Sequence, residues 1–287
     1  MPELPEVETV RQSLEQSILG RWVSEVVVGA FGGVIGDLTP DQFRGLIVGR
    51  EIIGIKRRGK YLLIDFDDGA GLIVHLRMTG SLTIAGSDTP PVRFEHLGIL
   101  LSNGTSIRFA DQRKFGRILY RPSSIPRPLE GKLGPEPLGA RFSARYLTRT
   151  LRGRSAPIKA LLLDQRVVAG IGNIYADEAL FRSRIHPQRS GGGLSPRETA
   201  SLVCSIKHVL RLAIERRGTT FSSYRDGNGE AGDNLPFLKV YGRGRRGEPC
   251  LRCGKPLAIL TVGGRTSHYC PRCQTLDGSR LDILDAP

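Results

Sequence analysis

Apolar residues recur every three or four positions at the start of the chain, a spacing typical of an amphipathic helix. The residues at this spacing are Val7, Val10, Leu14 and Ile18. Pro5 suits the first turn of a helix and Gly20 can end one. We therefore predict a helix across this opening segment.

Between residues 22 and 120 the pattern changes to short, β-branched runs bounded by turn-forming residues, which is typical of strands. The runs cover residues 23–28, 61–66, 72–76, 97–101 and 107–109. Asn103-Gly104 separates the last two, and this dipeptide supplies the positive φ angles that a tight hairpin turn needs. Short strands at this spacing predict an N-terminal antiparallel β-sandwich, led by the helix, over residues 1–120.

A proline-rich connector is predicted at residues 121–139, which hold five prolines. Beyond it the pattern turns helical. Ser195-Pro196-Arg197-Glu198 forms a capping box, and a helix with one apolar face is predicted from there to Gly218. We expect an α+β protein of several domains, with a helical domain over residues 140–236. A short strand at 237–241 opens the last segment, residues 237–287.

The charge balance points to a polyanionic partner. Lys and Arg number 42 and Asp and Glu number 28, which gives a formal net charge of +14. Nucleic acid is the first candidate partner and an anionic membrane surface the second. No run approaches the roughly 20 apolar residues of a membrane span. Acidic residues near the start argue against a secretory signal peptide, so we expect a cytoplasmic protein.

Four of the five cysteines lie in two CxxC pairs, Cys250-Leu-Arg-Cys253 and Cys270-Pro-Arg-Cys273. Two such turns can present four thiolates in a tetrahedron, so we predict one Zn²⁺ per chain. Four cysteines leave no open coordination position, which makes the predicted site structural. The fifth cysteine, Cys204, is expected to be a small core residue of the long helix.

The N-terminus carries a possible nucleophile. If Met1 is removed, Pro2 presents a secondary amine, and the carboxylates of Glu3 and Glu6 follow closely. An α-amine has an ordinary pKa near 8, so a useful fraction is neutral at pH 7. Its attack on an aldehydic carbon would give an iminium ion, which accepts electrons readily. The alternative is a helix N-terminus whose acidic residues favour the helix dipole.

Several sequence blocks resemble the formamidopyrimidine-DNA glycosylase family, bacterial enzymes that excise oxidised purines. The blocks occur in the family's order and span nearly the whole chain. They are PELPEVETV at the N-terminus, RRGKY around Lys60, HLRMTG at 75–80, DQRKFG at 111–116, GPEPL at 134–138, GIGNIY at 170–175, VYGR at 240–243 and the cysteine hairpin with Arg265.

The resemblance implies a catalytic set at the N-terminus. Pro2 would attack C1′ of the damaged nucleotide, and Glu3 would act as general acid and base. Glu6 would brace the N-terminal segment, and Lys60 would contact a phosphate beside the lesion. An iminium intermediate would let one enzyme cut the glycosidic bond and then eliminate both phosphates by β,δ-elimination.

The resemblance also implies how duplex DNA is held. Asn173, at the start of a predicted helix, would clamp a phosphate with Arg265 of the zinc hairpin, and His75 and Lys159 would be further DNA contacts. A base inside a duplex must be flipped out before it can react. Met78, Arg113 and Phe115 match the residues that the family inserts into the resulting gap. The implied architecture is a β-sandwich, a helix-two-turn-helix domain and a zinc-binding β-hairpin.

The sequence is compatible with three functions. The first is a bifunctional glycosylase and abasic-site lyase for oxidised purines, a monomer acting on damaged double-stranded DNA in the bacterial nucleoid. The segment at 218–225 favours it, because it resembles the loop that covers an extruded oxidised guanine. The second is the pyrimidine-directed endonuclease VIII relative, against which Leu4 argues. The third is a catalytically silent DNA-binding protein, against which Pro2, Glu3 and Lys60 together argue.

Overall fold

The computed structural model describes residues 1–125 and 129–277, and these form two units. Unit 1 comprises Met1–Glu130 and Ala213–Leu235. Unit 2 comprises Gly131–Leu212 and residues from Pro236 onward. The predicted boundaries at 120, 139 and 236 stay predictions. Pro126 and Pro128 of the predicted connector, and residues 278–287 of the predicted last segment, lie outside the described residues.

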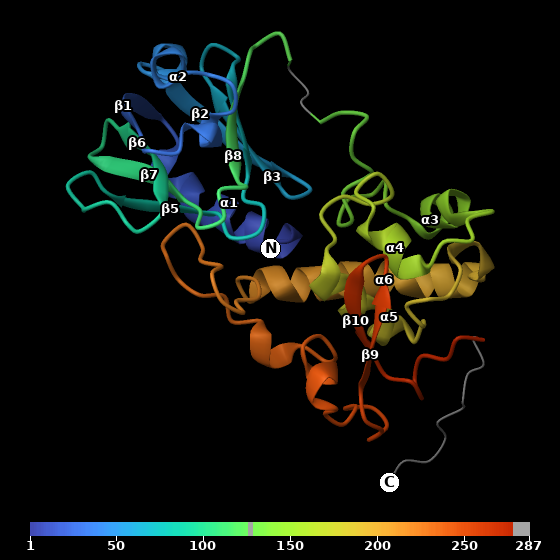
Figure 1. Ribbon diagram of the computed structural model, residues 1–287. Coiled ribbons are helices and arrows are strands. Elements are labelled where there is room, and N and C mark those ends of the chain that lie inside the picture. The colour runs from blue at the N-terminus through green and yellow to red at the C-terminus, as the bar shows by residue number, and fades with distance from the viewer. Residues whose placement is uncertain (126–128, 278–287) are drawn as a thin grey trace. The chain divides into compact units, whose positions relative to one another are not determined.

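Unit 1 is built on antiparallel strands (Figure 1). The order of strands is β5-β7-β6-β1-β2-β3-β4-β8. The bounds are β1 Arg21–Val28, β2 Glu51–Arg58, β3 Tyr61–Phe66, β4 Gly71–His75, β5 Ser81–Gly86, β6 Glu95–Leu101, β7 Thr105–Ala110 and β8 Arg117–Arg121. The hairpin predicted at Asn103-Gly104 is present between β6 and β7, and Gly104 has a φ of 76°. The short β-branched runs therefore form the antiparallel architecture that their pattern predicts.

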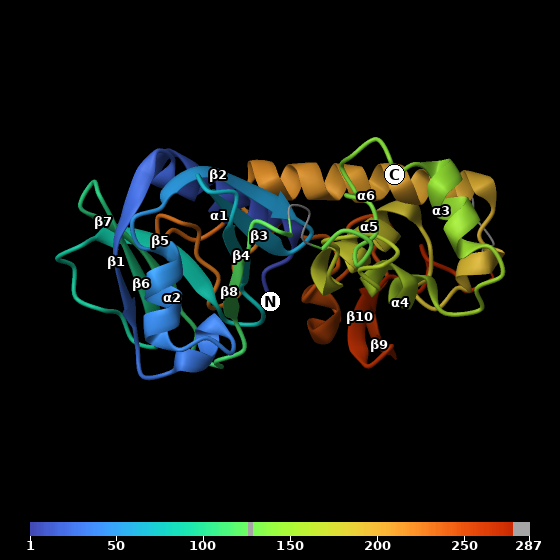
Figure 2. The ribbon, with the colours of Figure 1, turned by 90° about the horizontal axis from the view of Figure 1, so that it is seen from above.

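The helix predicted at the start of the chain is α1, Leu4–Ile18, and it packs against β2, β3 and β5 (Figure 2). Its four apolar residues at helical spacing are each at most 1% exposed and belong to the core of unit 1. Burying such a face is what stabilises a surface helix. The core thus fixes α1, and with it the residues that precede Leu4. The smaller elements of the unit are α2, Pro40–Ile47, and the 3₁₀ turn η1, Gly32–Ile35.

The helical segment predicted after the connector lies in unit 2, except that α6 ends and η3 begins in unit 1. The helices are α3 Ala144–Leu151, α4 Ile158–Leu163, α5 Asn173–Ser183 and α6 Pro196–Glu215, with 3₁₀ turns at η2 Gly191–Gly193, η3 Leu235–Phe237 and η4 Arg243–Arg246. The capping box of α6 is formed, because Ser195 Oγ accepts the Glu198 N–H and the Glu198 carboxylate accepts the Ser195 N–H. The cysteine segment adds a hairpin of β9, Ala258–Val262, and β10, Arg265–Tyr269.

Two local predictions are wrong. The predicted strand at 237–241 is absent, because the backbone N–H groups of residues 239–241 donate to the buried Glu178 carboxylate of α5 instead of to a strand partner. Cys204 is exposed and is not a core residue. It lies two positions from both Leu202 and Ile206, about 200° around the helix from each, and so faces away from their buried stripe.

Candidate functional site

Two carboxylates are buried at the N-terminus of α1. Glu3 is 3% exposed and Glu6 is 1% exposed. The Glu3 N–H donates to Glu6 Oε2 at 2.8 Å, and the Thr219 N–H donates to Glu6 Oε1 at 2.8 Å. Burial of a carboxylate is costly unless its oxygens are hydrogen-bonded, and here both Glu6 oxygens are. Glu6 therefore joins the first residues of the chain to the segment after α6.

The α-amine at the start of the chain lies among charged groups. Burial lowers the pKa of the Met1 amine below its ordinary value, and the positive charges of Lys60 and Arg113 act in the same direction, while Glu3 and Glu6 oppose them. Lys60 is 6% exposed and lies in the turn between β2 and β3. A lowered pKa enlarges the neutral fraction of an amine, and the neutral amine is the nucleophile. Pro2 is itself buried in this environment.

His75 ends β4 and is a neutral side chain at pH 7. Burial, with the positive charges of Arg77 and Lys60, lowers the pKa of His75 to about 4. Its Nδ1 accepts the Arg77 N–H at 2.9 Å, so the single proton of the neutral ring lies on Nε2. The Tyr61 ring packs edge-on against it, with centroids 4.5 Å apart. Any phosphate contact of His75 would therefore be a neutral N–H donation and not an ion pair.

The three predicted gap-filling residues come from two loops that are tied together. Met78 is 38% exposed, Phe115 is 50% exposed, and the Arg113 guanidinium lies 4.9 Å from the centroid of the Phe115 ring. The Asp111 carboxylate is buried, and it accepts hydrogen bonds from the Thr79 hydroxyl and from backbone N–H groups of the 113–116 turn. The Asp111 hydrogen bonds thus hold the two loops together while the side chains of Met78 and Phe115 remain exposed to solvent. Exposed apolar side chains on a fixed backbone are suited to insertion between stacked nucleobases.

In unit 2, Asn173 contacts the zinc hairpin next to Arg265. Asn173 is the first residue of α5, and its Nδ2 donates to the Thr266 carbonyl at 2.9 Å. Arg265 is exposed and directly precedes Thr266. The turn that carries Arg265 consists of Gly263 and Gly264, both with positive φ, which a tight two-residue hairpin turn requires. Asn173 therefore lies at a helix N-terminus, which favours an anion such as phosphate, and is hydrogen-bonded to the residue that follows Arg265.

Lys159, also predicted to contact DNA, is not exposed to solvent. Its side chain is fully buried, with Nζ 2.7 Å from Asp177 Oδ1 and 2.9 Å from the Thr266 carbonyl oxygen. This burial argues against a direct phosphate contact, because the ammonium already lies between a carboxylate and a carbonyl. Lys159 instead supports β10, the strand that begins with Arg265.

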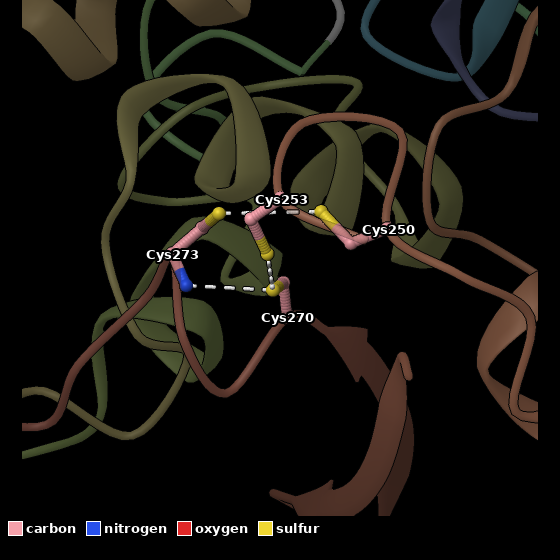
Figure 3. A group of neighbouring side chains, drawn as sticks. All are labelled: Cys250, Cys253, Cys270 and Cys273. Carbon is pink, nitrogen blue, oxygen red and sulfur yellow. Dashed lines mark hydrogen bonds between the residues drawn. The ribbon is translucent and has the colours of Figure 1, made fainter. Parts of the chain in front are cut away.

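The four paired cysteines form one cluster, in which the sulfur atoms point toward a common centre (Figure 3). All four sulfur atoms lie within 4.8 Å of one another, with Cys250–Cys273 at 4.0 Å and Cys253–Cys270 at 3.5 Å. Four sulfur ligands at a Zn–S distance of about 2.3 Å would lie about 3.8 Å apart in a tetrahedron. Backbone N–H groups of Arg252 and Cys273 also donate to cysteine sulfurs, at 3.4 Å each. The set fits a single structural Zn²⁺, as the spacing predicts.

Two acidic residues of α5 were missed in the sequence. Asp177 and Glu178 are both buried, and they hold β10 and the 239–241 segment respectively. Burial raises the pKa of Glu178, against the lowering effect of its three backbone hydrogen bonds. The only sequence signal was a pair of adjacent acids inside a helix that also supplies apolar core residues. Among the described residues, no helix is both long and apolar enough to cross a membrane.

Comparison with known families covers most of the chain. Residues 1–118 match the formamidopyrimidine-DNA glycosylase N-terminal domain, residues 133–225 its H2TH domain, and residues 247–276 the zinc finger found in FPG and IleRS. Two similar relatives are proteins named formamidopyrimidine-DNA glycosylase. That of Herpetosiphon aurantiacus is 47% identical, over 96% of this chain and 100% of its own. That of Pelotomaculum thermopropionicum is 48% identical, over 96% of this chain and 99% of its own.

Solved structures agree with this assignment. A point mutant of Lactococcus lactis FPG, in complex with DNA containing Fapy-dG, has a TM-score of 0.88 and 36% identity, covering 96% of this chain and 100% of that one. The MutM (FPG) protein of Thermus thermophilus has a TM-score of 0.83 and 40% identity, covering 95% and 98%. The chain described here belongs to the formamidopyrimidine-DNA glycosylase family, the DNA glycosylases of base excision repair.

Proposed function

We propose that this chain is a bifunctional DNA glycosylase and abasic-site lyase that removes oxidised purines from duplex DNA through a Pro2 iminium intermediate. The supporting observation is the buried N-terminal environment. Burial lowers the pKa of the Met1 amine there, Pro2 is buried directly after it, and Glu3 and Lys60 are also buried. A neutral amine next to a carboxyl group is the pair that nucleophilic attack with proton transfer needs.

The proposed reaction begins when the Pro2 nitrogen, freed by removal of Met1, donates its electron pair to C1′. The glycosidic bond breaks, and the departing base takes the proton that the Pro2 nitrogen loses. Protonated Glu3 gives its proton to the ring oxygen as the bond between C1′ and that oxygen breaks, and the nitrogen forms an iminium ion with C1′. The iminium acidifies the hydrogen on C2′, and loss of this proton to water expels the 3′ phosphate. Loss of the hydrogen on C4′ of the unsaturated iminium then expels the 5′ phosphate. Water hydrolyses the remaining adduct and releases Pro2.

We propose that DNA is held by side chains on both units. In unit 1, Lys60 and the neutral His75 would contact phosphates, while Met78, Arg113 and Phe115 would fill the gap left by the flipped nucleotide. In unit 2, Asn173 and Arg265 would clamp a phosphate. The complexes of the Lactococcus lactis protein with Fapy-dG-containing and abasic-site-containing DNA support damaged DNA as the partner. We further propose that the protein acts as a monomer in the bacterial cytoplasm, at the nucleoid.

Borohydride trapping tests the chemistry directly. The protein is mixed with a duplex containing 8-oxoguanine opposite cytosine, and sodium borohydride is added. An iminium intermediate would be reduced to a permanent protein–DNA crosslink at Pro2, identifiable by peptide mass. A DNA-binding protein without catalysis would give no crosslink, which would contradict the proposal. Parallel duplexes with an oxidised pyrimidine measure the purine preference, and faster excision of the pyrimidine would favour the endonuclease VIII alternative.

A further inference from the structure

Asn234 lies in the part of unit 1 that follows α6, and it is 5% exposed. Its Nδ2 donates to the Thr219 hydroxyl at 2.9 Å, and its backbone N–H donates to the Gly218 carbonyl at 3.0 Å. Thr219 also pairs with Asp233 in an isolated antiparallel bridge. Asn234 therefore fixes residues 218 and 219 through both its side chain and its backbone.

Thr219 is connected in turn to the N-terminal end of the chain. Its N–H donates to Glu6 Oε1, and the Glu3 N–H donates to Glu6 Oε2, each at 2.8 Å. The two oxygens belong to one rigid, planar carboxylate, so a displacement of Thr219 turns Glu6 or breaks one of these bonds. Asn234, Thr219, Glu6 and Glu3 thus form a continuous series of buried hydrogen bonds.

The surroundings leave Glu6 little room to adjust. Gly218 has a φ of 79°, and a Cβ atom there would lie 3.0 Å from Glu6 Cγ. The Tyr224 hydroxyl lies 3.2 Å from the Glu6 carbonyl oxygen and can donate to it. Close packing of this kind transmits a displacement instead of absorbing it. Thr219 can therefore set the position of Glu6, and through Glu6 that of the Glu3 backbone.

We propose that Asn234 is a positioning residue for base excision: by holding Thr219 it keeps Glu6, and through Glu6 the acid Glu3, in place. This inference rests on the proposed function, in which Glu3 protonates the sugar ring oxygen. Base excision and cutting at an abasic site should differ in how much they depend on Asn234. Excision needs Glu3 to open a closed sugar, whereas an abasic sugar is already partly in the open aldehyde form. Disturbing Asn234 should therefore slow excision much more than cutting at an abasic site.

The test uses five variants of the full chain under single-turnover conditions: four single substitutions and the double variant that combines Asn234→Ala with Thr219→Val. Asn234→Ala removes the amide donor, and Thr219→Val removes the hydroxyl acceptor while keeping side-chain shape. Thr219→Ser keeps the hydroxyl and measures rescue. Asn103→Ala is the matched control, because Asn103 is also a hydrogen-bonded loop asparagine of unit 1 but has no bond to this series. Excision of 8-oxoguanine, cutting at a preformed abasic site, and affinity for undamaged duplex are measured for each.

We expect Asn234→Ala and Thr219→Val each to slow excision about tenfold, with abasic-site cutting and affinity within twofold of the original chain. The double variant should be no slower than either single one, because both remove the same bond. Thr219→Ser should restore most of the rate, and Asn103→Ala should change nothing.

Unchanged excision in Asn234→Ala would overturn the inference, and so would an equal loss of both activities accompanied by a lower melting temperature. If the original chain itself gave no borohydride crosslink on abasic DNA, the proposed function would fail instead, whatever the Asn234 variants did.

Discussion

Lys159 and Asp177 form an ion pair in which neither side chain is exposed to solvent, with Nζ and Oδ1 2.7 Å apart. Asp177 Oδ2 accepts the His268 N–H at 2.8 Å, and Lys159 Nζ donates to the Thr266 carbonyl. The pair therefore joins α4 and α5 to β10. Because Arg265 begins β10, the strand that carries this exposed residue is held by two charged groups that are both buried.

Replacing one member of this pair should be strongly destabilising. Lys159→Met leaves the Asp177 carboxylate buried without its ammonium partner, and we expect a loss of about 3–5 kcal/mol in the free energy of unfolding. Chemical denaturation measures it. Lys56→Met is the control, since Lys56 forms an exposed ion pair with Asp65 and should cost less than about 1 kcal/mol. Equal effects of the two substitutions would show that the buried pair contributes no more than a surface one.

His75 should make the fold sensitive to acid. Its folded pKa is about 4, below the ordinary value of 6.5, so the unfolded chain binds more protons between these two pH values. Stability therefore rises with pH across this window and is lost as the pH falls from 6.5 toward 4, by about 3 kcal/mol. Comparing the pH dependence of unfolding in His75→Gln and in the original chain measures this. The same slope in both would contradict the prediction.

The local pattern of the sequence was enough for the elements that carry their own signals. The apolar stripe of α1, the Asn103-Gly104 turn and the capping box of α6 are all present because each depends on neighbours within a few residues. The cysteine pairs are equally self-contained, since each CxxC turn presents two sulfur atoms and only the meeting of the two turns is a tertiary event.

Interactions between distant residues were not predictable in this way. Lysine is usually a surface residue, and the burial of Lys159 depends on Asp177 and on the Thr266 carbonyl, more than a hundred positions away. The strand predicted at 237–241 is replaced by hydrogen bonds to Glu178, which no local pattern reveals. Charged residues buried against partners far along the chain are thus what sequence patterns miss, and here they hold the predicted DNA-contacting residues in place.

Zinc should be bound at one ion per chain and should stabilise the hairpin. Cys273→Ser removes one of four ligands, so we expect loss of the metal, unfolding of the β9–β10 region and weaker binding to duplex DNA, because metal binding supplies much of the folding energy of a small zinc module. Metal analysis and hydrogen exchange are the measurements. The control is Cys204→Ser, which changes an exposed cysteine outside the cluster. A metal-free original chain with full affinity would contradict the prediction.

The active protein should lack Met1. The proposed attack needs the Pro2 nitrogen as a free secondary amine, and the small Pro2 side chain favours removal of the initiator. Intact-mass measurement on protein that forms the borohydride crosslink checks this. A variant with one extra residue kept before Pro2 should bind duplex DNA but form no crosslink. Crosslinking by protein that retains Met1 would rule out Pro2 as the nucleophile.

The last prediction separates chemistry from binding by comparing Glu3→Gln with Arg265→Ala. Glu3→Gln keeps the shape of the side chain and removes its acid, so base excision should fall by about 10²–10⁴-fold while DNA affinity is retained. Arg265→Ala removes an exposed cation from the start of β10, so affinity should fall for damaged and undamaged duplex alike. Its salt dependence should also become shallower, since each neutralised phosphate contributes a slope of about −0.9 in log K against log salt.

The contrast depends on where the two residues lie. Glu3 is buried beside the N-terminal amine, where loss of its acid would affect the proposed proton transfer. Arg265 is exposed at a hairpin turn, where it is accessible from solvent. If Glu3→Gln weakened binding as much as Arg265→Ala, with excision reduced only in proportion, Glu3 would be a binding residue and not the acid. If Arg265→Ala lost preference for damaged DNA while its salt slope stayed the same, the hairpin would recognise bases or DNA shape, because a lost phosphate contact must reduce the number of counterions released.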